Sequence, residues 1–307
     1  MNDTPQLAVR RNSMLGLGMA LAGALLITPD TLLIRLSGLE GWGLTFWRGL
    51  LIGLGLLVMW LLVEGKNAAL AQIPALFTGP AIIILIANML NSVAFNFATL
   101  ETSITVVLTA IATAPLIAAA LAYLILGERT APRTWIAIGA TMIGVLIVIA
   151  NGDGALQAPD GNVWLGGGLG MIAACGIACV FVMARRNPEA PVLLACGIGT
   201  LISSLFGLAG MDASTMFQGN FIAILIMGLF IMPVSWGLLT LAPRQTSPTN
   251  VSLFMLLEMV LGPFWVWLGT GERPNLAMMG GTALVLLTLI VYFILSARDL
   301  RASKPET

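Results

Sequence analysis

Long apolar stretches alternate with short polar turns along the whole chain, and this alternation is the strongest structural signal in the sequence. A helix that crosses a bilayer needs about 20 consecutive, mostly apolar residues. By that length the pattern predicts an all-α integral membrane protein with ten transmembrane helices. The ten predicted spans cover residues 13–36, 44–63, 77–99, 104–126, 133–150, 164–184, 191–209, 220–240, 249–269 and 276–297.

The apolar stretches are apolar on both faces, which favours helices over the strands of a membrane barrel. Barrel strands alternate apolar and polar residues, whereas "PAIIILIANML" and "GVLIVIA" do not. Composition agrees, since 58% of the 307 residues are hydrophobic and only 9% are charged, with a mean hydropathy of +0.98. A soluble domain carries about a quarter charged residues, whereas lipid-facing helices need none because their backbone groups are bonded internally.

Lysine and arginine are distributed unequally between the two ends of the predicted spans. With ten spans, eleven of the fourteen basic residues fall on the side of the two termini. Because basic residues favour the cytoplasmic side, we expect a multi-pass membrane protein with both termini in the cytoplasm. The N-terminal "MNDTPQLAVRRNS" is followed by no small-residue cleavage site, so we expect the first span to be retained.

A Gly-Glu-Arg motif occurs twice, in "LGERTAPRTW" (126–135) and "GTGERPNLAM" (269–278), 144 positions apart. Shifting the chain by 144 aligns residues 98–129 with residues 242–273 without a gap, and nine of the 32 pairs are identical. The identical pairs include polar Thr and Ser at one end and Gly-Glu-Arg at the other. We interpret the chain as two homologous halves, in which each glycine ends a helix and the charges stay in water.

The polar stretch "NGDGALQAPDG" separates the two halves after the fifth span. The predicted organisation is a first five-helix repeat at 1–150, a linker at 151–163, and a second five-helix repeat at 164–307 with a short cytoplasmic tail. Because five is odd, the second repeat must cross the bilayer in the opposite direction. Inverted repeats around a central cavity are typical of secondary transporters that work by alternating access.

With these motifs, the chain resembles the EamA-type ten-helix exporters of the drug/metabolite transporter superfamily over nearly its whole length. "APLIAAALAYLILGER" (114–129) matches the family pattern closely, and "FWRGLLIGLGLL" (46–57) resembles its second span. "EMVLGPFWVWLGTGER" (258–273) departs from it, because Met259 stands where the family has proline and Pro263 follows four residues later. The resemblance implies export across a bacterial inner membrane, similar in character to bacterial exporters of aromatic and other neutral amino acids.

Four prolines inside predicted spans are candidate hinges, because proline removes a backbone hydrogen bond and kinks a helix. They are Pro29, Pro115, Pro233 and Pro263. For the ninth span, the absence of proline at position 259 predicts a kink displaced toward Pro263.

Two carboxylates in apolar surroundings are candidate substrate ligands, because a charge at the centre of a span costs about 2.5 to 3.5 kcal/mol. Asp30 follows Pro29 late in the first span; it either contacts the ammonium group of an amino acid or pairs with Arg35 or Arg48. Glu258 lies near the middle of the ninth span without a basic residue nearby in sequence. It is a candidate for binding ammonium or carrying a proton, and the alternative is a hydrogen bond between helices.

A polar stripe in the third span is the candidate lining of an uncharged cavity. Asn88, Ser92 and Asn96 follow at intervals of four residues and share a helix face, with Asn91 beside them. Because a polar stripe cannot face lipid, it must face protein or water. The 144-residue offset relates Asn91 and Ser92 to Ser235 and Trp236, and the Trp236 ring offers a face to an ammonium group or an aromatic side chain. The alternative role is hydrogen bonding between helices.

The remaining composition argues against cofactors, metals and charged partners. The chain has no histidine and a net charge of zero, so we expect no metal site and no nucleic-acid partner. Cys175, Cys179 and Cys196 lie in apolar spans and are interpreted as buried hydrophobic residues. No Gly-Lys-Ser/Thr loop exists to bind ATP. Because no lysine or arginine is predicted near the midplane, phosphorylated substrates are disfavoured.

We therefore expect a non-enzymatic exporter of small neutral metabolites, above all aromatic or hydrophobic amino acids. Its partners are a small-molecule substrate and the lipid bilayer, and one chain already contains both halves of a functional monomer. The first alternative is efflux of lipophilic cationic drugs, with Asp30 and Glu258 as counter-charges. A lipid-processing intramembrane enzyme is a further alternative, which the scattered acids and the lack of histidine disfavour.

Overall fold

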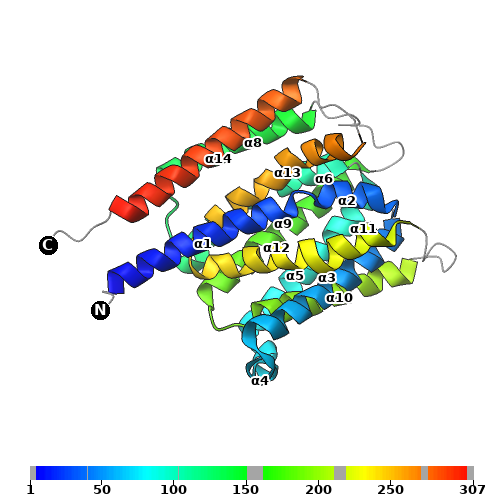
Figure 1. The fold of residues 1–307 in the computed structure, drawn as a ribbon, viewed down its shortest axis with the longest axis horizontal. Helices are drawn as coiled ribbons and strands as arrows, with labels where there is room; N and C mark the ends of the chain where they lie inside the picture. The colour runs from blue at the N-terminus through cyan, green and yellow to red at the C-terminus, as the bar shows by residue number, and fades with distance from the viewer. Residues whose placement is uncertain are drawn as a thin grey trace.

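The computed structural model describes residues 5–39, 41–102, 104–150, 162–210, 219–270 and 276–302. Within these ranges every long element is a helix. The first helix begins and the last helix ends at the same end of the bundle (Figure 1). We call this end the termini end.

The first half contains five apolar spans, two of them interrupted. Two short helices, α4 and η1, connect the second span to the third. The elements are α1 (Pro5–Ile27), α2 (Asp30–Ser37), α3 (Gly41–Glu64), α4 (Lys66–Ala71), η1 (Pro74–Phe77), α5 (Gly79–Glu101), α6 (Ile104–Ile111), α7 (Ala114–Leu121), η2 (Ala122–Leu126) and α8 (Pro132–Ala150).

The second half repeats this order with different interruptions. Its third span begins with a short α-helix and a π-helical segment, η3, before the proline-containing α12. The elements are α9 (Val163–Arg186), α10 (Val192–Gly210), α11 (Phe221–Leu225), η3 (Ile226–Ile231), α12 (Met232–Leu241), η4 (Ala242–Arg244), α13 (Pro248–Thr270) and α14 (Leu276–Ala302).

The ten predicted spans correspond to the helices of the described chain. Nine of the described helical segments are long and apolar enough to cross a membrane, and a shorter apolar helix at Pro132–Ile147 occupies the position of the fifth span. Most predicted bounds agree with the observed helices to within a few residues, because each polar break between apolar runs is short. The exceptions are α1, which begins at Pro5 and not at residue 13, and α14, which continues to Ala302 and not only to residue 297.

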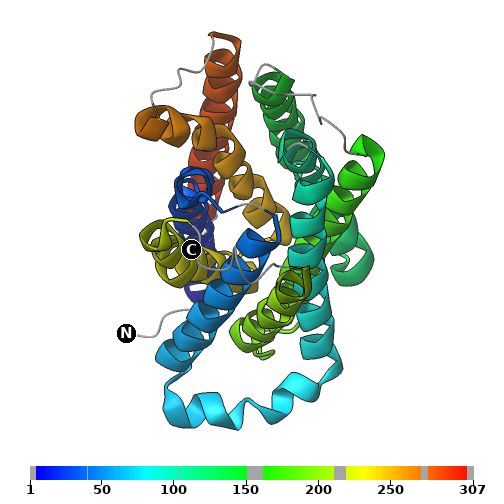
Figure 2. The same ribbon diagram turned by 90° about the vertical axis from the view of Figure 1, so that its right-hand side faces the viewer.

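Helix packing follows an approximate two-fold relation between the halves. The pairs α3 with α10, α8 with α14, and α7 with α13 each join a span to its counterpart in the other half. Two further pairs, α5 with α9 and α12 with α1, correspond to each other, because α9 is the counterpart of α1 and α12 is the counterpart of α5. The same set of contacts therefore occurs twice, as inverted repeats require, and the helices surround a common centre (Figure 2).

One close approach between α3 and α10 brings two counterpart glycines together. Gly53 and Gly197 are 144 residues apart, and each lies against the backbone carbonyl of the other. A Cβ at Gly53 would lie 2.6 Å from Cγ of Leu201 and 3.0 Å from the Gly197 oxygen. Small residues are needed here because helix association in lipid depends on close van der Waals packing.

Breaks in the spans occur at two of the predicted hinges. The first span is interrupted between α1 and α2 at Thr28 and Pro29, and the fourth between α6 and α7 just before Pro115. Pro233 lies in the first turn of α12, directly after η3. The expected displaced kink in the ninth span is not seen as a break, since α13 is one continuous helix through Pro263. A transmembrane helix tolerates an interior proline because neighbouring groups satisfy the backbone carbonyl that the proline leaves free.

The first Gly-Glu-Arg motif ends a helix as predicted. Gly127 adopts a φ of 70°, and its N–H donates to carbonyl oxygens of the preceding turn. This left-handed conformation favours glycine and closes the helix. Glu128 is partly exposed and Arg129 is exposed, so both remain accessible to water. The second copy, at 271–273, lies outside the described residues.

The outer surface of the bundle is apolar, with large exposed side chains such as Leu62, Ile136 and Leu287. Exposed apolar surface on this scale belongs in contact with lipid. The expectation that all three cysteines are buried is wrong for Cys175, which is exposed, whereas Cys196 is buried and Cys179 is intermediate. A thiol is apolar enough to face lipid as readily as it faces a protein core.

Candidate functional site

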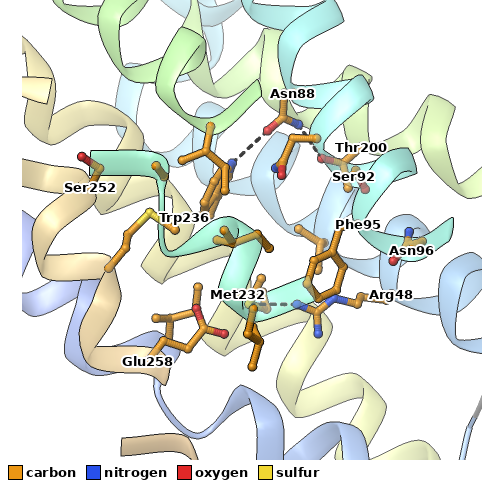
Figure 3. Close-up of a pocket in the computed structure, with 18 of the residues that line it drawn as sticks. Arg48, Asn88, Ser92, Phe95, Asn96, Thr200, Met232, Trp236, Ser252 and Glu258 are labelled. Atoms are coloured by element: carbon orange, nitrogen blue, oxygen red, sulfur yellow. Dashed lines mark hydrogen bonds between the residues drawn. The ribbon is translucent and has the colours of Figure 1, made fainter. Parts of the chain in front are cut away.

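A central cavity of about 110 Å³ lies between the two halves, with room for several water molecules. Both halves contribute side chains to it, as Figure 3 shows. The polar lining consists of Arg48, Asn88, Asn91, Ser92, Asn96, Thr200, Ser252 and Glu258. Among the apolar residues are Ile27, Ile52, Phe95, Leu108, Ile111, Met232, Trp236, Met255 and Met259.

An ion pair between Arg48 and Asp30 forms at the end of the cavity farther from the termini. Asp30 begins α2 directly after the break at Pro29, and Arg48 lies two turns into α3. Nη1 of Arg48 donates to Oδ1 of Asp30 at 3.0 Å, and Nη2 lies 2.7 Å from Oδ2. This two-point geometry is the strongest way for a guanidinium to bind a carboxylate. Asp30 is 1% exposed and does not line the cavity, so Arg48 stands between it and the free space.

Besides Asp30, the Arg48 guanidinium contacts two methionine sulfur atoms and an aromatic ring. Its guanidinium contacts the sulfur atoms of Met227 and Met232, and its central carbon lies 5.9 Å from the centre of the Phe95 ring. Sulfur and aromatic faces are weak partners compared with a carboxylate. The cavity-facing side of Arg48 therefore keeps the capacity to bind an anionic group.

Glu258 lines the central cavity from α13, as Arg48 does from α3. It lies ten residues from the start of α13, about 15 Å along the helix, close to the middle of a hydrocarbon core of about 30 Å. Figure 3 places Glu258 and Arg48 on the same side of the cavity, with Met232 between them. Two carboxyl groups thus face one guanidinium, and the group of three carries no net positive charge.

Asn88 organises the other side of the cavity by bonding to two helices of the second half. Its amide nitrogen donates to the carbonyl oxygen of Cys196 at 3.0 Å and to the hydroxyl of Thr200 at 2.9 Å. Its amide oxygen accepts from Nε1 of Trp236 at 3.1 Å. Both amide protons and the oxygen of this buried side chain are satisfied, so Asn88 holds the Trp236 ring at the cavity wall.

The polar stripe of α5 faces the interior, as its spacing predicted. The hydroxyls of Ser92 and Ser203 share a hydrogen bond of 2.8 Å, which fixes α5 to α10. Asn91 and Asn96 line the same cavity, and Asn96 is 6% exposed. The stripe therefore contributes both to the cavity wall and to the contacts between helices.

Ser235 does not join the other predicted residues at the cavity. It is fully buried, and its hydroxyl donates to the carbonyl oxygen of Ile231 at 2.6 Å. The backbone of Ser235 lies against Gly23 of α1. Adjacent residues on a helix point about 100° apart, so Trp236 faces the cavity while Ser235 faces α1.

Several lining residues were not predicted from the sequence. Thr200 and Ser252 contribute hydroxyl groups, whereas Phe95, Met232 and Met255 contribute apolar surface. The polar run from Thr200 to Ser204, inside an otherwise apolar span, was the available signal for α10. Nothing in the sequence distinguishes the lining methionines from those that face lipid.

The sequence predicted no basic residue near the midplane, but it did not predict that Arg48, two turns into α3, would line the cavity. Arg48 is 9% exposed and lines the central cavity. It can be buried because Asp30, eighteen residues earlier, compensates its charge. The argument against phosphorylated substrates must therefore rest on the combined charge of Arg48, Asp30 and Glu258, which offers no excess of positive charge to a phosphate.

Trp236→Phe is expected to lower the free energy of unfolding by about 1 to 3 kcal/mol, because it leaves the buried Asn88 oxygen without its donor. Thermal unfolding in detergent would measure the change. Trp164→Phe is the matched control, since Trp164 is 91% exposed and its replacement should change little. Equal stability of the Trp236 and Trp164 variants would contradict the role assigned to the Asn88 bond.

Comparison with known proteins agrees with this architecture. The model of the EamA-like transporter family matches residues 14–150 and 164–294, one match for each half. A solved structure titled "Crystal structure of protein" has the same fold, with a TM-score of 0.75 over 94% of this chain and 99% of that chain, at 16% identity. No curated protein matches the sequence.

The fold and the cavity define a membrane transporter built from two inverted five-helix repeats. The chain belongs to the EamA-like transporter family. It is accordingly a transporter of the drug/metabolite type, with a small-molecule substrate and a bilayer as its surroundings.

Proposed function

We propose that this protein exports zwitterionic neutral amino acids, with a preference for aromatic or hydrophobic side chains. The observation that carries the proposal is the presence of Arg48 and Glu258 in one otherwise uncharged cavity. A zwitterion carries one anionic and one cationic group on adjacent carbons. Arg48 is placed to bind the carboxylate, and Glu258 is placed to bind the ammonium.

The rest of the cavity suits the remainder of such a substrate. Trp236 and Phe95 offer aromatic faces, and the methionines Met232, Met255 and Met259 offer adaptable apolar surface. Amide and hydroxyl groups from Asn91, Ser92 and Thr200 supply hydrogen bonds without further charge. A small number of polar groups in a mostly apolar wall is the usual composition of a small-molecule site.

Transport proceeds, in this proposal, by alternating access of the central cavity to the two sides of the membrane. The breaks at Pro29 and Pro115, and the proline of α12, Pro233, are placed to let helix segments move relative to one another, and Pro263 remains a candidate hinge of α13. One chain supplies both repeats, so a monomer is sufficient. The excess of arginine and lysine at the termini end supports placing that end in the cytoplasm of a bacterial cell.

A flux panel with purified protein in proteoliposomes tests this substrate class. Neutral amino acids, acidic and basic amino acids, and lipophilic cationic dyes would be compared under the same conditions. We expect saturable flux of aromatic and large aliphatic amino acids, and at least roughly tenfold less for acidic or basic ones, which would bring an unpaired charge into the cavity. Empty liposomes provide the background.

Efflux of lipophilic cations is the second candidate, favoured by the two carboxyl groups that face a single guanidinium and by the methionine-rich wall. It predicts flux of cationic dyes and none of amino acids. That outcome would overturn the amino-acid proposal while leaving the central cavity as the site of transport.

A further inference from the structure

A second cavity, of about 270 Å³, lies at the termini end of the bundle and is not part of the central site. Unlike the central cavity, it is lined mostly by charged and hydrogen-bonding side chains from α8, α9, α13, α14 and the loop after η2. We call it the termini-end cavity.

One wall of the termini-end cavity is held by a continuous hydrogen-bond chain across both halves. The hydroxyl of Tyr292 shares a bond of 2.9 Å with Thr134 and donates to Oδ1 of Asn250 at 2.7 Å. Nδ2 of Asn250 donates to the hydroxyl of Thr246 at 3.1 Å. Because these side chains are hydrogen-bonded to one another, they form a fixed polar wall, and we do not assign them as ligands.

Two further polar atoms of the lining have no partner within the described part of the chain. They are Oε1 of Gln245 and the hydroxyl of Ser296, both inaccessible to bulk water. Ser296 as a residue is only 5% exposed. An unpaired buried polar group costs about 1 to 3 kcal/mol. Each atom would gain a partner if its side chain turned toward a hydrogen-bond donor in the cavity.

The charges around the cavity leave one arginine available. Arg185 donates through Nε to Glu128 at 3.0 Å, and Arg133 pairs with Asp299. Arg129 is exposed, lines the cavity, and has no acidic partner among the described residues. Within the described ranges, the site thus offers one cation without an acidic partner together with these two polar atoms.

The termini-end cavity continues along the same helix faces as the central cavity. On α9, Ile177 lines the central cavity and Arg185 lines the termini-end cavity. Phe181 lies between them at intervals of four residues, on the same face. It is fully buried and contacts the Trp236 ring, with 6.0 Å between ring centres. About 6 Å of helix separates Phe181 from the lining residue on each side.

We propose that the termini-end cavity is a second binding site for the transported zwitterion, separated from the central site by the Phe181 side chain. Arg129 binds the carboxylate, and the ammonium donates to Oε1 of Gln245 and to the hydroxyl oxygen of Ser296. This inference rests on the proposed function for the identity of the solute. It adds a place where the solute binds on the termini side before or after it passes Phe181.

Equilibrium binding of tritiated L-phenylalanine to the purified protein in nanodiscs of phosphatidylcholine tests the proposal. We expect two molecules bound per chain. Arg129→Gln should weaken one of the two sites roughly tenfold and leave the other unchanged, whereas Glu258→Gln should do the reverse. Arg186→Gln is the matched control, since Arg186 is an exposed arginine at the same end that does not line the cavity. Thermal unfolding of each variant shows that the fold is retained.

Each outcome of this experiment decides between the proposals. One site per chain, weakened by Glu258→Gln and not by Arg129→Gln, would overturn the second site and leave the proposed function intact. One site weakened only by Arg129→Gln would support the second site and contradict the amino-acid role of the central cavity. Loss of the second site in nanodiscs of phosphatidylglycerol would identify a lipid headgroup as its occupant and overturn the inference. Absence of any binding would overturn both proposals.

Discussion

Arg48→Met is expected to lower the free energy of unfolding by about 3 to 5 kcal/mol, because it leaves the carboxylate of Asp30 buried without its partner. Asp30 is 1% exposed, and the Arg48 guanidinium binds each of its two carboxylate oxygens. No other described basic side chain is shown to contact it. Thermal unfolding in detergent and the yield of folded protein would measure the loss.

The double variant Asp30→Asn with Arg48→Met is the control for this prediction. Removing both charges together leaves no unpaired ion, and buried ion pairs replaced as pairs are often close to neutral in stability. We expect the double variant to recover most of the stability lost by Arg48→Met, but not substrate binding. A single Arg48→Met variant as stable as the unmodified protein would show that the ion pair is not what holds Asp30.

Glu258→Gln is expected to weaken binding and exchange of neutral amino acids roughly tenfold to a hundredfold, because a charge-assisted hydrogen bond to the ammonium group is lost. Glutamine has nearly the same shape, so we expect the fold to be retained. Counterflow in proteoliposomes would measure exchange, and thermal unfolding would measure stability.

The exposed Glu189 provides the matched control, since Glu189→Gln removes an acid outside both cavities. It should leave exchange unchanged. If Glu258→Gln abolishes flux driven by a pH gradient but leaves exchange intact, Glu258 carries a proton rather than the ammonium group. Unchanged driven flux together with unchanged exchange would remove Glu258 from the mechanism.

The spans and the repeat could be predicted because they depend on properties that the sequence states directly. Apolar runs of bilayer length fix the helices, and the doubled Gly-Glu-Arg motif gives the 144-residue offset between the halves. The counterpart glycines Gly53 and Gly197, which meet at the α3 and α10 crossing, are related by that same offset. The interior direction of Asn88, Ser92 and Asn96 followed from helical periodicity alone.

The site could be predicted only in part, because side-chain pairing depends on helix rotation and depth. The sequence left Arg35 and Arg48 as equal partners for Asp30, and only the packing of α2 against its neighbours selects Arg48. It also treated Ser235 and Trp236 as one patch, whereas the rotation of α12 turns only Trp236 to the cavity. The sequence does not identify the cavity methionines, because methionines that face lipid also lie in apolar runs.

The most direct test of the central claim is competition for phenylalanine counterflow by two truncated analogues. Phenethylamine keeps the ammonium group and the ring, and phenylpropionate keeps the carboxylate and the ring. Because Arg48 and Glu258 are proposed to bind both charged groups, each analogue should compete at least roughly tenfold more weakly than unlabelled phenylalanine. Competition by phenethylamine as strong as that of phenylalanine itself would contradict the account, since the cavity would then recognise a cation and an apolar group without a carboxylate.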